Sequence, residues 1–575
     1  MKILSRIISV LFIFLLLNSA SSLLPVFART SATANLALLN GRIWTGNEKS
    51  PWAEAVAIRD NKIVRVGKNA DIKLLISKAT KVIDLGGRLV TPGFNDAHTH
   101  FLGGALDLTE INLIGARSLE VLQSRVVEYA RQHPNEAWLT GAGWEYSSFP
   151  GQRLPTRADL DAVIKDRPVY LRAYDGHTGW ANSRALELAG ITNATKFDGF
   201  GEIVRDEKGE PTGVFKEGAQ GLVRKLIPNP SHDKQLEALR QGMKLAASLG
   251  ITSIQNASGS VEELALYQEL LGRGELTLRA SIAFSMGKTL TDKKLAQMIS
   301  LKEKYRGNQM LRAGAVKFVL DGVIESHTAA MLEPYSDDPK LQGEPSYQAE
   351  IYNDLVTRCA KAGFQIYTHA IGDRAVQMAL DAYEKIRQGV KQPDLRSRIE
   401  HIETVSARDI PRFARLGVLA SMEPIHADPD TIDVWSKAVG SERVKRAFPW
   451  NELQKNGARL VFSSDWPATI SVDPMRGLHN AVNRRTIEGN PQGGWIPEQR
   501  ITPDQALRAY TVTGSYASFE EQFKGMIALG MLADIIVFSQ DVFKIDPLKI
   551  HKTRVVMNVF DGKIIYRNSV LWAEK

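Results

Sequence analysis

VTPGFNDAHTH, residues 90–100, begins as an apolar segment of β type and ends in two histidines that are separated by one residue. Residues two apart on a strand point to the same side, so His98 and His100 can both reach a single metal ion. Two histidines at this spacing are common in proteins without a metal site. The pair indicates a metal site only in combination with other histidines of the chain. A strand over Gly93–His98 is the first element that we predict.

Seven further segments have the same character, because each is apolar and ends at or near a polar residue. Amphipathic segments of helix length, such as Leu236–Leu249 and Tyr352–Ala362, lie between them. The seven predicted strands are Ile251–Ala257, Thr277–Phe284, Ala315–Leu320, Gln365–His369, Arg398–His401, Val418–Glu423 and Arg459–Asp465. Alternation of strand and helix predicts a parallel sheet, and eight strands close a (β/α)8 TIM barrel, an α/β fold.

Three of these strands end in residues that bind metals. His369 and His401 end the fifth and sixth predicted strands, and Asp465 ends the eighth. Active sites of such barrels assemble at the carboxyl ends of the strands. Histidine nitrogen and aspartate oxygen are donors that suit Zn²⁺ or a similar divalent ion, so we predict a metal site at this end.

Lys317 lies in the fourth predicted strand, between apolar residues and at an inward-facing position. A buried ammonium group without a partner is costly. Either the side chain extends to solvent or pairs with Asp321, or the lysine is modified or neutralised at the metal site. The residues alone leave both readings open.

About 150 residues separate the first two predicted strands, far more than one crossover helix needs. We therefore expect a subdomain, inserted at about residues 108–235, over the mouth of a barrel that spans residues 91–515. Short β-type segments with glycine turns fill both ends of the mature chain. We expect residues 32–90 and 516–575 to pair into one small β-sandwich domain.

The first residues have the features of a secretory signal. Lys2 and Arg6 precede the apolar run Ile7–Leu17, and small residues lead to Ala28. We predict a cleaved signal peptide over residues 1–28, no stable membrane span afterwards, and a secreted or periplasmic protein. An uncleaved N-terminal anchor is the alternative.

Composition excludes several classes of protein. The chain has 575 residues and a formal net charge of +8, but its lysines and arginines are dispersed, which argues against nucleic-acid binding. Its single cysteine, Cys359, cannot form an internal disulfide. Five histidines fit no pattern and are assigned to the surface or to structure: His133, His232, His426, His479 and His551.

Taken together, the motifs resemble the amidohydrolase superfamily, in particular the amidohydrolase-3 or YtcJ-like branch that includes N-substituted formamide deformylases. The resemblance covers nearly all of the mature chain. It is carried by residues 90–100, 174–177 (YDGH), 316–318 (VKF), 321–322 (DG), 368–375 (THAIGDRA), 400–403 (EHIE) and 463–467 (SSDWP).

This resemblance implies a centre of two divalent ions, with zinc as the expected metal. One ion would be held by His98, His100 and Asp465, the other by His369 and His401, and an N-carboxylated Lys317 would bridge them. Asp465 would also act as the general base. A single ion with an unmodified lysine is the alternative.

The resemblance further implies a hydrolase of carbon–nitrogen bonds other than peptide bonds, with a small-molecule amide-type substrate such as an N-substituted amide or formamide. Alternatives are a deaminase, an ester or lactone hydrolase, or a non-catalytic metal-binding barrel. We expect His177 to contact the substrate carbonyl or oxyanion. Further substrate contacts are expected from Trp144, Glu145, Asp321 and His327. Trp144, Trp180 and Tyr174 either wall a pocket or belong to the core. A homodimer is compatible with the sequence.

Overall fold

Eight parallel strands form the central sheet of this computed structural model, which describes residues 33–390 and 394–573. Neighbouring strands follow one another in chain order, as a (β/α)8 barrel requires. The strands are β8 (Phe94–Thr99), β15 (Ile251–Gly259), β16 (Arg279–Ser285), β17 (Leu311–Val319), β18 (Gln365–Ala370), β19 (Arg398–His401), β20 (Leu419–Met422) and β21 (Leu460–Phe462). Each corresponds to a predicted strand, so the predicted barrel is confirmed.

Two backbone hydrogen bonds join the first strand to the segment that follows the last. The N–H of Asp465 donates to the carbonyl of His98 over 2.8 Å, and the N–H of His100 donates to the carbonyl of Trp466 over 2.7 Å. The last strand ends at Phe462, three residues before its predicted end, and Asp465 itself is not extended, with a φ of 60°. The barrel is therefore closed between the end of β8 and the segment that follows β21.

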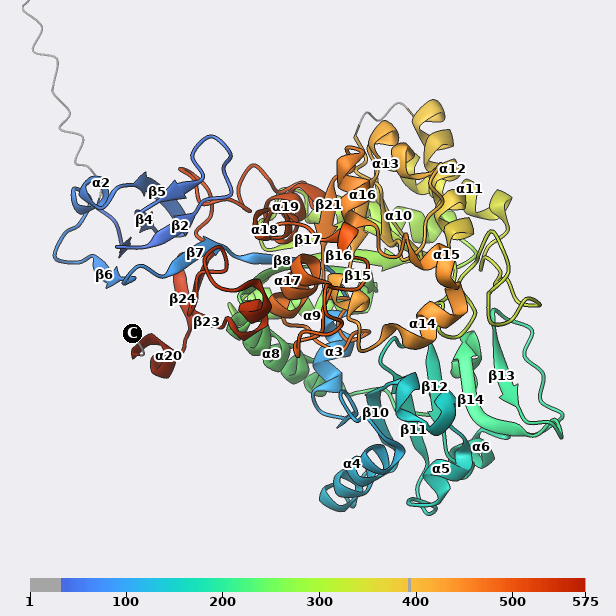
Figure 1. Cartoon of the computed structure of the whole chain (residues 1–575). Helices are drawn as coiled ribbons and strands as arrows, with labels where there is room; N and C mark the ends of the chain where they lie inside the picture. Colours follow the sequence, from blue (N-terminus) through green and yellow to red (C-terminus); the bar gives the residue numbers. More distant parts are fainter. Residues whose placement is uncertain (1–32, 391–393, 574–575) are drawn as a thin grey trace, which may run out of the picture.

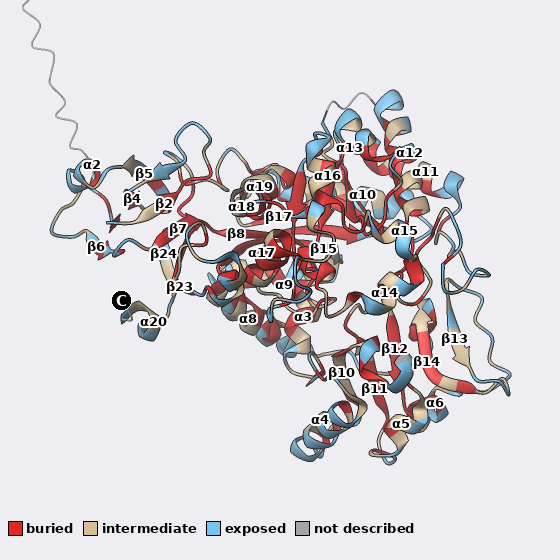
Figure 2. Ribbon diagram, viewed as in Figure 1, coloured by how far each residue is buried: buried red, intermediate tan, exposed pale blue. Residues whose placement is uncertain are grey.

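Helices cover the outside of the barrel, and the faces that they turn toward it are buried (Figure 2). Helix α9 (Val261–Gly272) begins after Ser260, whose hydroxyl accepts a hydrogen bond from the N–H of Glu263 over 3.1 Å. The two predicted amphipathic segments coincide closely with α8 and α11. The other helices around the barrel are α8 (His232–Ser248), α10 (Asp292–Lys304), α11 (Ala349–Lys361), α12 (Asp373–Gly389), α13 (Ile410–Leu416), α14 (Ile432–Val439), α15 (Ser441–Val444), α16 (Trp450–Lys455), α17 (Pro474–Asn483), α18 (Pro503–Tyr510) and α19 (Val512–Ala517).

Between β8 and β15 the chain forms a second sheet, which lies beside the barrel at the lower right of Figure 1. Its strands, in spatial order, are β13 (Gly201–Arg205), β14 (Pro211–Glu217), β12 (Thr178–Ala181), β11 (Val169–Ala173), β10 (Leu139–Trp144) and β9 (Ile111–Asn112). The helices of this region are α3 (Phe101–Asp107), α4 (Leu119–Gln132), α5 (Arg157–Asp161), α6 (Ser183–Ala189) and α7 (Gly221–Arg224). This sheet occupies the part of the chain where we predict an insertion.

Strands from both ends of the chain meet in a third region, at the left of Figure 1. A six-stranded sheet contains β24 (Lys563–Arg567), β23 (Val555–Phe560), β22 (Ile535–Phe538), β7 (Leu89–Pro92), β2 (Arg42–Trp44) and β3 (Trp52–Ala53). A four-stranded sheet contains β5 (Lys62–Gly67), β4 (Ala55–Arg59), β1 (Leu36–Leu39) and β6 (Lys81–Asp84), with α2 (Asn69–Lys73) beside it. Short helix α20 (Ser569–Ala573) follows β24. One apolar core, which includes Ile58 and Val537, joins the two sheets.

Arg279 ties this terminal β-domain to the barrel. The guanidinium lies at the start of β16 and pairs with Asp534 at 2.7 Å and with Asp561 at 2.9 Å. Because the arginine is buried, the pairs are shielded from solvent. The exact bounds of the three regions, predicted at residues 32–90, 91–515 and 516–575, remain predictions.

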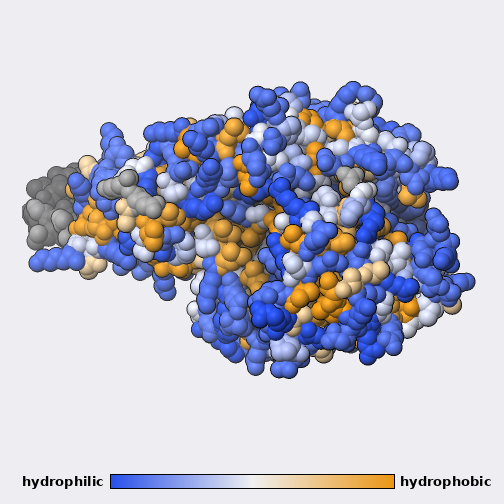
Figure 3. Space-filling view, turned by 60° about the horizontal axis from the view of Figure 1, so that its bottom comes forward, coloured by the Kyte–Doolittle hydropathy of each residue, from blue (hydrophilic) through white to orange (hydrophobic). Residues whose placement is uncertain are grey.

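The surface is mixed in character. Figure 3 shows a face on which hydrophilic side chains predominate and hydrophobic ones are interspersed. None of the described helices is both long enough and apolar enough to cross a membrane. The predicted signal peptide, residues 1–28, lies outside the described residues.

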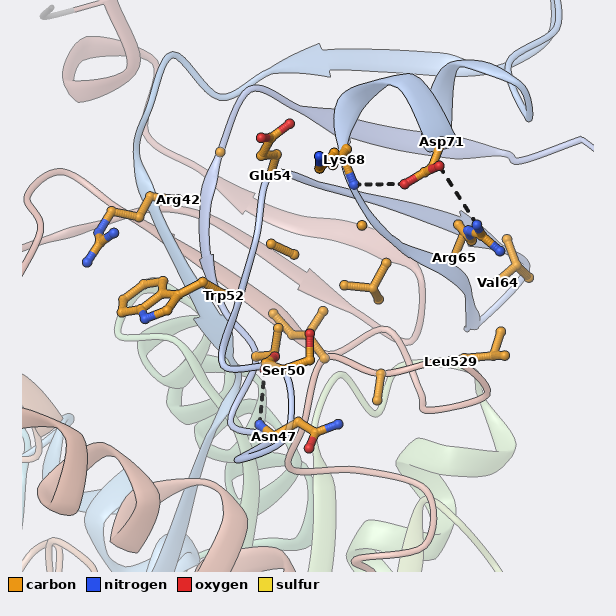
Figure 4. A pocket seen from close by; sticks show the side chains of 17 residues that line it. Arg42, Asn47, Ser50, Trp52, Glu54, Val64, Arg65, Lys68, Asp71 and Leu529 are labelled. Carbon is orange, nitrogen blue, oxygen red and sulfur yellow. Dashed lines mark hydrogen bonds and ion pairs between the residues drawn. The ribbon is translucent and has the colours of Figure 1, made fainter.

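A cavity of about 840 Å³ lies in the terminal β-domain (Figure 4). Trp52 and Lys68 both line it, and the guanidinium of Arg42 lies 3.7 Å from the centre of the Trp52 ring. None of the predicted metal ligands lines this cavity. It is therefore separate from the strand ends of the barrel.

Candidate active site

A second cavity, of about 400 Å³, lies at the carboxyl ends of the barrel strands. Five predicted ligands line it: His100, Lys317, His369, His401 and Asp465. The sixth, His98, is fully buried beside them, with Nε2 3.3 Å from Oδ1 of Asp465 and 3.1 Å from Nζ of Lys317. Nε2 of His100 lies 3.2 Å from the same Asp465 oxygen, and the rings of His369 and His401 are 4.5 Å apart. All six side chains converge.

Two of these residues have left-handed backbone conformations. His401 has a φ of 74° and Asp465 a φ of 60°. Such conformations cost about 1–3 kcal/mol in residues other than glycine and are concentrated at functional sites. At Asp465 the hydrogen bond to the carbonyl of His98 holds the strained turn, and the carboxylate lies close to both His98 and His100.

A buried ion pair orients His98 from behind. Nδ1 of His98 lies 2.7 Å from Oε2 of Glu400, and Oε1 of Glu400 accepts a hydrogen bond from Nε of Arg398 over 2.6 Å. An imidazole whose Nδ1–H donates to a carboxylate has an unprotonated Nε2, and the lone pair of that nitrogen can bind a metal ion. His100 is held in a similar way, with Nδ1 2.5 Å from the hydroxyl of Ser258.

Several buried polar atoms at the centre have no hydrogen-bond partner among the described residues. They include Oδ1 of Asp465, Nδ1 of His401 and Oε2 of Glu423, although the last two lie 2.9 Å apart. Ligand atoms of His98, His401 and Asp465 lie within 4.8 Å of one another. A divalent cation would satisfy nitrogen and oxygen donors of this kind, so the residues fit the predicted metal.

Burial sets the protonation of the histidines. It lowers the pKa values of His98, His369 and His401 well below the usual range, and neighbouring positive charges act in the same direction. The three imidazoles are therefore neutral, the form in which histidine binds a cation. Burial also lowers the pKa of Lys317, although the carboxylate of Glu400 opposes this shift.

Asp321 does not pair with Lys317. Its carboxylate accepts hydrogen bonds from the backbone N–H groups of Ala330, Ile371 and Gly372, over 2.9, 3.1 and 2.8 Å. It thus fixes the loops that follow β17 and β18. Pairing of Lys317 with Asp321, which is one half of the first of the two readings left open by the sequence, is therefore wrong.

His177 reaches the cavity from the inserted sheet, in the loop between β11 and β12. Its Nδ1 lies 2.8 Å from Oε2 of Glu217, and its ring is 5.4 Å from that of His369. Burial acts to lower the pKa of His177, but the carboxylate of Glu217 outweighs it and raises the pKa to about 9. At neutral pH the side chain is an imidazolium that can donate a hydrogen bond to an oxygen in the cavity.

The other four predicted substrate contacts do not line this cavity. Trp144 is fully buried in the core of the inserted subdomain with Trp180, so the core reading holds for both, whereas Tyr174 is on the cavity wall. Glu145 follows β10 on the far side of Tyr174, in a separate small pocket. Asp321 is held in its loop, and His327 pairs with Asp337 at 2.8 Å.

Sequence reasoning missed His426, which it assigned to the surface or to structure. The residue lies just after β20, with its ring stacked on that of His401 at 5.9 Å and its Nε2 3.9 Å from Oδ2 of Asp465. Glu423, which ends the seventh predicted strand, was missed too. Their position after a barrel strand was the available signal. Asn256 and Ser258, at the end of the second predicted strand, had the same signal, whereas three other cavity residues had none: Arg172, Arg224 and Glu263.

Fold and site together define a barrel hydrolase whose strand ends fit a metal. The sequence model of the amidohydrolase family matches residues 81–566, and the chain belongs to this family, whose members are metal-dependent hydrolases. It is 30% identical to the putative amidohydrolase YtcJ of Bacillus subtilis over 92% of this chain and 99% of that one. It is 27% identical to the N-substituted formamide deformylase of Arthrobacter pascens over 93% of this chain and 99% of that one.

A solved structure shares the fold. The uncharacterized metal-dependent hydrolase from Pyrococcus horikoshii OT3 superposes with a TM-score of 0.70 and 26% identity, over 89% of this chain and 99% of that one. The likeness extends over the barrel and most of the remaining chain.

Proposed function

We propose that this chain hydrolyses a carbon–nitrogen bond other than a peptide bond in a small-molecule N-substituted amide or formamide. One observation carries the proposal: Oδ1 of Asp465 is buried without a hydrogen-bond partner and lies 3.2–3.3 Å from Nε2 of both His98 and His100. A carboxylate in that position can share a cation and receive a proton. The similarity to a formamide deformylase supports the substrate class.

We propose two zinc ions as the cofactors, on the donor set described above. His98, His100 and Asp465 would hold one ion, and His369 and His401 the other. Such ions lower the pKa of a bound water and polarise a carbonyl group. The buried donors without partners support this assignment.

Lys317 would bridge the two ions after modification by CO₂. The neutral amine nitrogen would attack the carbon of CO₂, form an N–C bond and release one proton, which gives an anionic carbamate. Burial of Lys317, its position on the cavity wall and its 3.1 Å distance from His98 support the reaction, because the carbamate removes an isolated buried cation.

Two side chains would handle the substrate. Asp465 would accept a proton from water during attack and pass it to the leaving nitrogen as the tetrahedral intermediate collapses. The imidazolium of His177, held by Glu217, would donate a hydrogen bond to the carbonyl oxygen as negative charge develops there. Both groups line the same cavity.

We also propose that the protein is exported, on the basis of Lys2, Arg6 and the apolar run Ile7–Leu17. N-terminal sequencing of protein recovered from the medium or periplasm would test this. A mature N-terminus near residue 29 is expected, and an intact Met1 in cell-bound protein would contradict it.

Metal analysis and a turnover assay together test the activity. Full-length mature protein would be purified with bicarbonate and without chelator, and then assayed for amine release from N-formyl- and N-acetylbenzylamine. We expect two divalent ions per chain and release of benzylamine. No release by zinc-loaded protein from any N-acyl amine would contradict the proposed reaction.

A further inference from the structure

A buried contact joins the inserted subdomain to a loop of the barrel, next to His177. Glu217 ends β14, and its side chain is 7% exposed. Its Oε2 lies 2.8 Å from Nδ1 of His177, and its Oε1 accepts a hydrogen bond from the hydroxyl of Thr328 over 2.6 Å. Thr328 lies in the loop between β17 and α11. One carboxylate of the inserted subdomain therefore contacts both a cavity residue and a residue of the barrel.

The hydroxyl of Thr328 is arranged to donate to Glu217, because an ionised carboxylate only accepts hydrogen bonds. Its Oγ1 accepts from the N–H of Val323 over 3.0 Å, and Oγ of Ser326 lies 2.8 Å away. A competing acceptor, the carbonyl of Val323, is farther away at 3.3 Å. A hydrogen bond from a hydroxyl to a carboxylate is charge-assisted and stronger than one between neutral groups. The loop after β17 thus places the hydroxyl, and the hydroxyl holds the carboxylate.

The backbone on both sides constrains this contact. Glu217 has a φ of 50°, which is uncommon for a residue other than glycine and typical of functional sites. Its N–H donates to the carbonyl of His177 over 2.9 Å. On the barrel side, a Cβ atom at Gly322 would lie 2.1 Å from Oγ1 of Thr328 and 2.3 Å from Oε1 of Glu217. Only glycine at position 322 leaves space for the contact.

We propose that Thr328 is a positioning residue for the reaction: its hydroxyl holds Glu217, and Glu217 directs the side chain of His177 at the carbonyl oxygen of the substrate. The inference rests on the proposed function, which gives His177 its role. It assigns the orientation of a side chain of the inserted subdomain to a loop of the barrel. Misplacement of a reacting group by about 1 Å can cost about 10²-fold in rate, so loss of this hydroxyl should slow the reaction. The alternative is that Thr328 stabilises only its own loop, through Val323 and Ser326.

Amide hydrogen exchange of the zinc-loaded full chain, followed by mass spectrometry, separates these two roles without relying on turnover. Thr328→Val removes the hydroxyl and keeps the shape of the side chain. We expect at least about tenfold faster exchange both in residues 322–328 and in residues 174–177 of the inserted subdomain, because loss of a hydrogen bond to a charged group favours local opening. Faster exchange in residues 322–328 alone would overturn the proposal.

Turnover of N-formylbenzylamine measures the effect on the reaction. Because a hydrogen bond to the developing negative charge acts in the transition state, Thr328→Val should lower kcat by about 10²-fold and change KM by less than about threefold. Thr328→Ser keeps the hydroxyl and should keep the kcat of the wild type. Thr289→Val, on the exposed loop after β16, is the matched control and should leave both exchange and kcat unchanged. All three variants should bind as many metal ions as the wild type.

Two kinetic results would also overturn the assignment. One is an unchanged kcat of Thr328→Val in an enzyme that releases benzylamine. The other is an equal loss of kcat in Thr328→Val and Thr328→Ser, which would show that the hydroxyl does not act on His177. If the wild type releases no amine while residues 174–177 still respond to Thr328→Val, the proposed reaction fails and the support of His177 by Thr328 stands.

Discussion

At the scale of single residues, some groups around the candidate active site can be predicted from the sequence and others cannot. His98, His100, His369, His401 and Asp465 follow strand-like segments, and the barrel brings every strand end to one face. Their convergence was therefore predictable. The position of Trp144 was not predictable. Whether it lies in the core or on a pocket wall depends on how the inserted sheet packs, and the sequence around Trp144 does not determine that packing.

Replacement of Asp465 by asparagine should abolish the proton transfer and leave the fold intact. The amide cannot accept a proton, and general-base catalysis contributes about 10²–10⁴-fold to rate. We expect amine release to fall by at least that factor, while the circular dichroism spectrum is unchanged. Asp354→Asn, at an exposed position of α11, is the matched control. Full activity of Asp465→Asn would show that another group is the base.

Lys317→Ala should remove the proposed bridging carboxylate. We expect loss of activity and a drop in bound metal to at most one ion per chain, measured by elemental analysis. Added acetate or propionate should restore part of the activity, because a small carboxylate can occupy the vacated space. Rescue is not expected in His98→Ala. An active Lys317→Ala protein with two bound ions would contradict the carbamate.

At the scale of elements, β19 carries both a predicted ligand and the support for another. Its short sequence RIEH places Arg398, Glu400 and His401 in four successive residues, all buried. The strand itself was predictable from its apolar setting between turns. The use of Glu400 to hold His98 on β8 was not, since contacts across the barrel interior depend on side-chain directions that the strand pattern leaves open.

Arg398→Met should destabilise the protein through its effect on Glu400. Loss of the guanidinium leaves a buried carboxylate with no cationic partner, and breaking a buried pair in this way costs about 3–5 kcal/mol. Urea unfolding of the metal-loaded protein would measure the change. Lys385→Met, on the exposed face of α12, should change stability by no more than about 0.5 kcal/mol. Unchanged stability of Arg398→Met would contradict the proposed role of the pair.

At the scale of the whole molecule, the barrel and the terminal β-domain form one connected structure, joined by the ion pairs of Arg279 with Asp534 and Asp561. The alternation of strands and helices was enough to predict the barrel, and glycine-rich β segments at both ends were enough to suggest a shared domain. The order of strands in that domain could not be predicted. It depends on pairing between strands as distant in the chain as β7 and β22, where Val90 lies opposite Val537.

Removal of the metal should lower the thermal stability of the whole chain. A ligand present at about 1,000 times its Kd stabilises the folded state by about 4 kcal/mol. We expect a melting temperature several degrees lower after chelation and recovery on addition of zinc. His98→Ala should show no response to the chelator. An unchanged melting temperature of the wild type would contradict a resident metal.

The sheet shared by both ends of the chain determines when the active site can mature during synthesis. Strand β7 pairs with β22, and β7 leads directly into β8, which contains His98 and is followed by His100. On a ribosome, β7 emerges long before its partner, and its edge stays open to aggregation until the last segment is translated. A premature stop codon before β22 would leave an intact set of metal ligands on an unsupported strand.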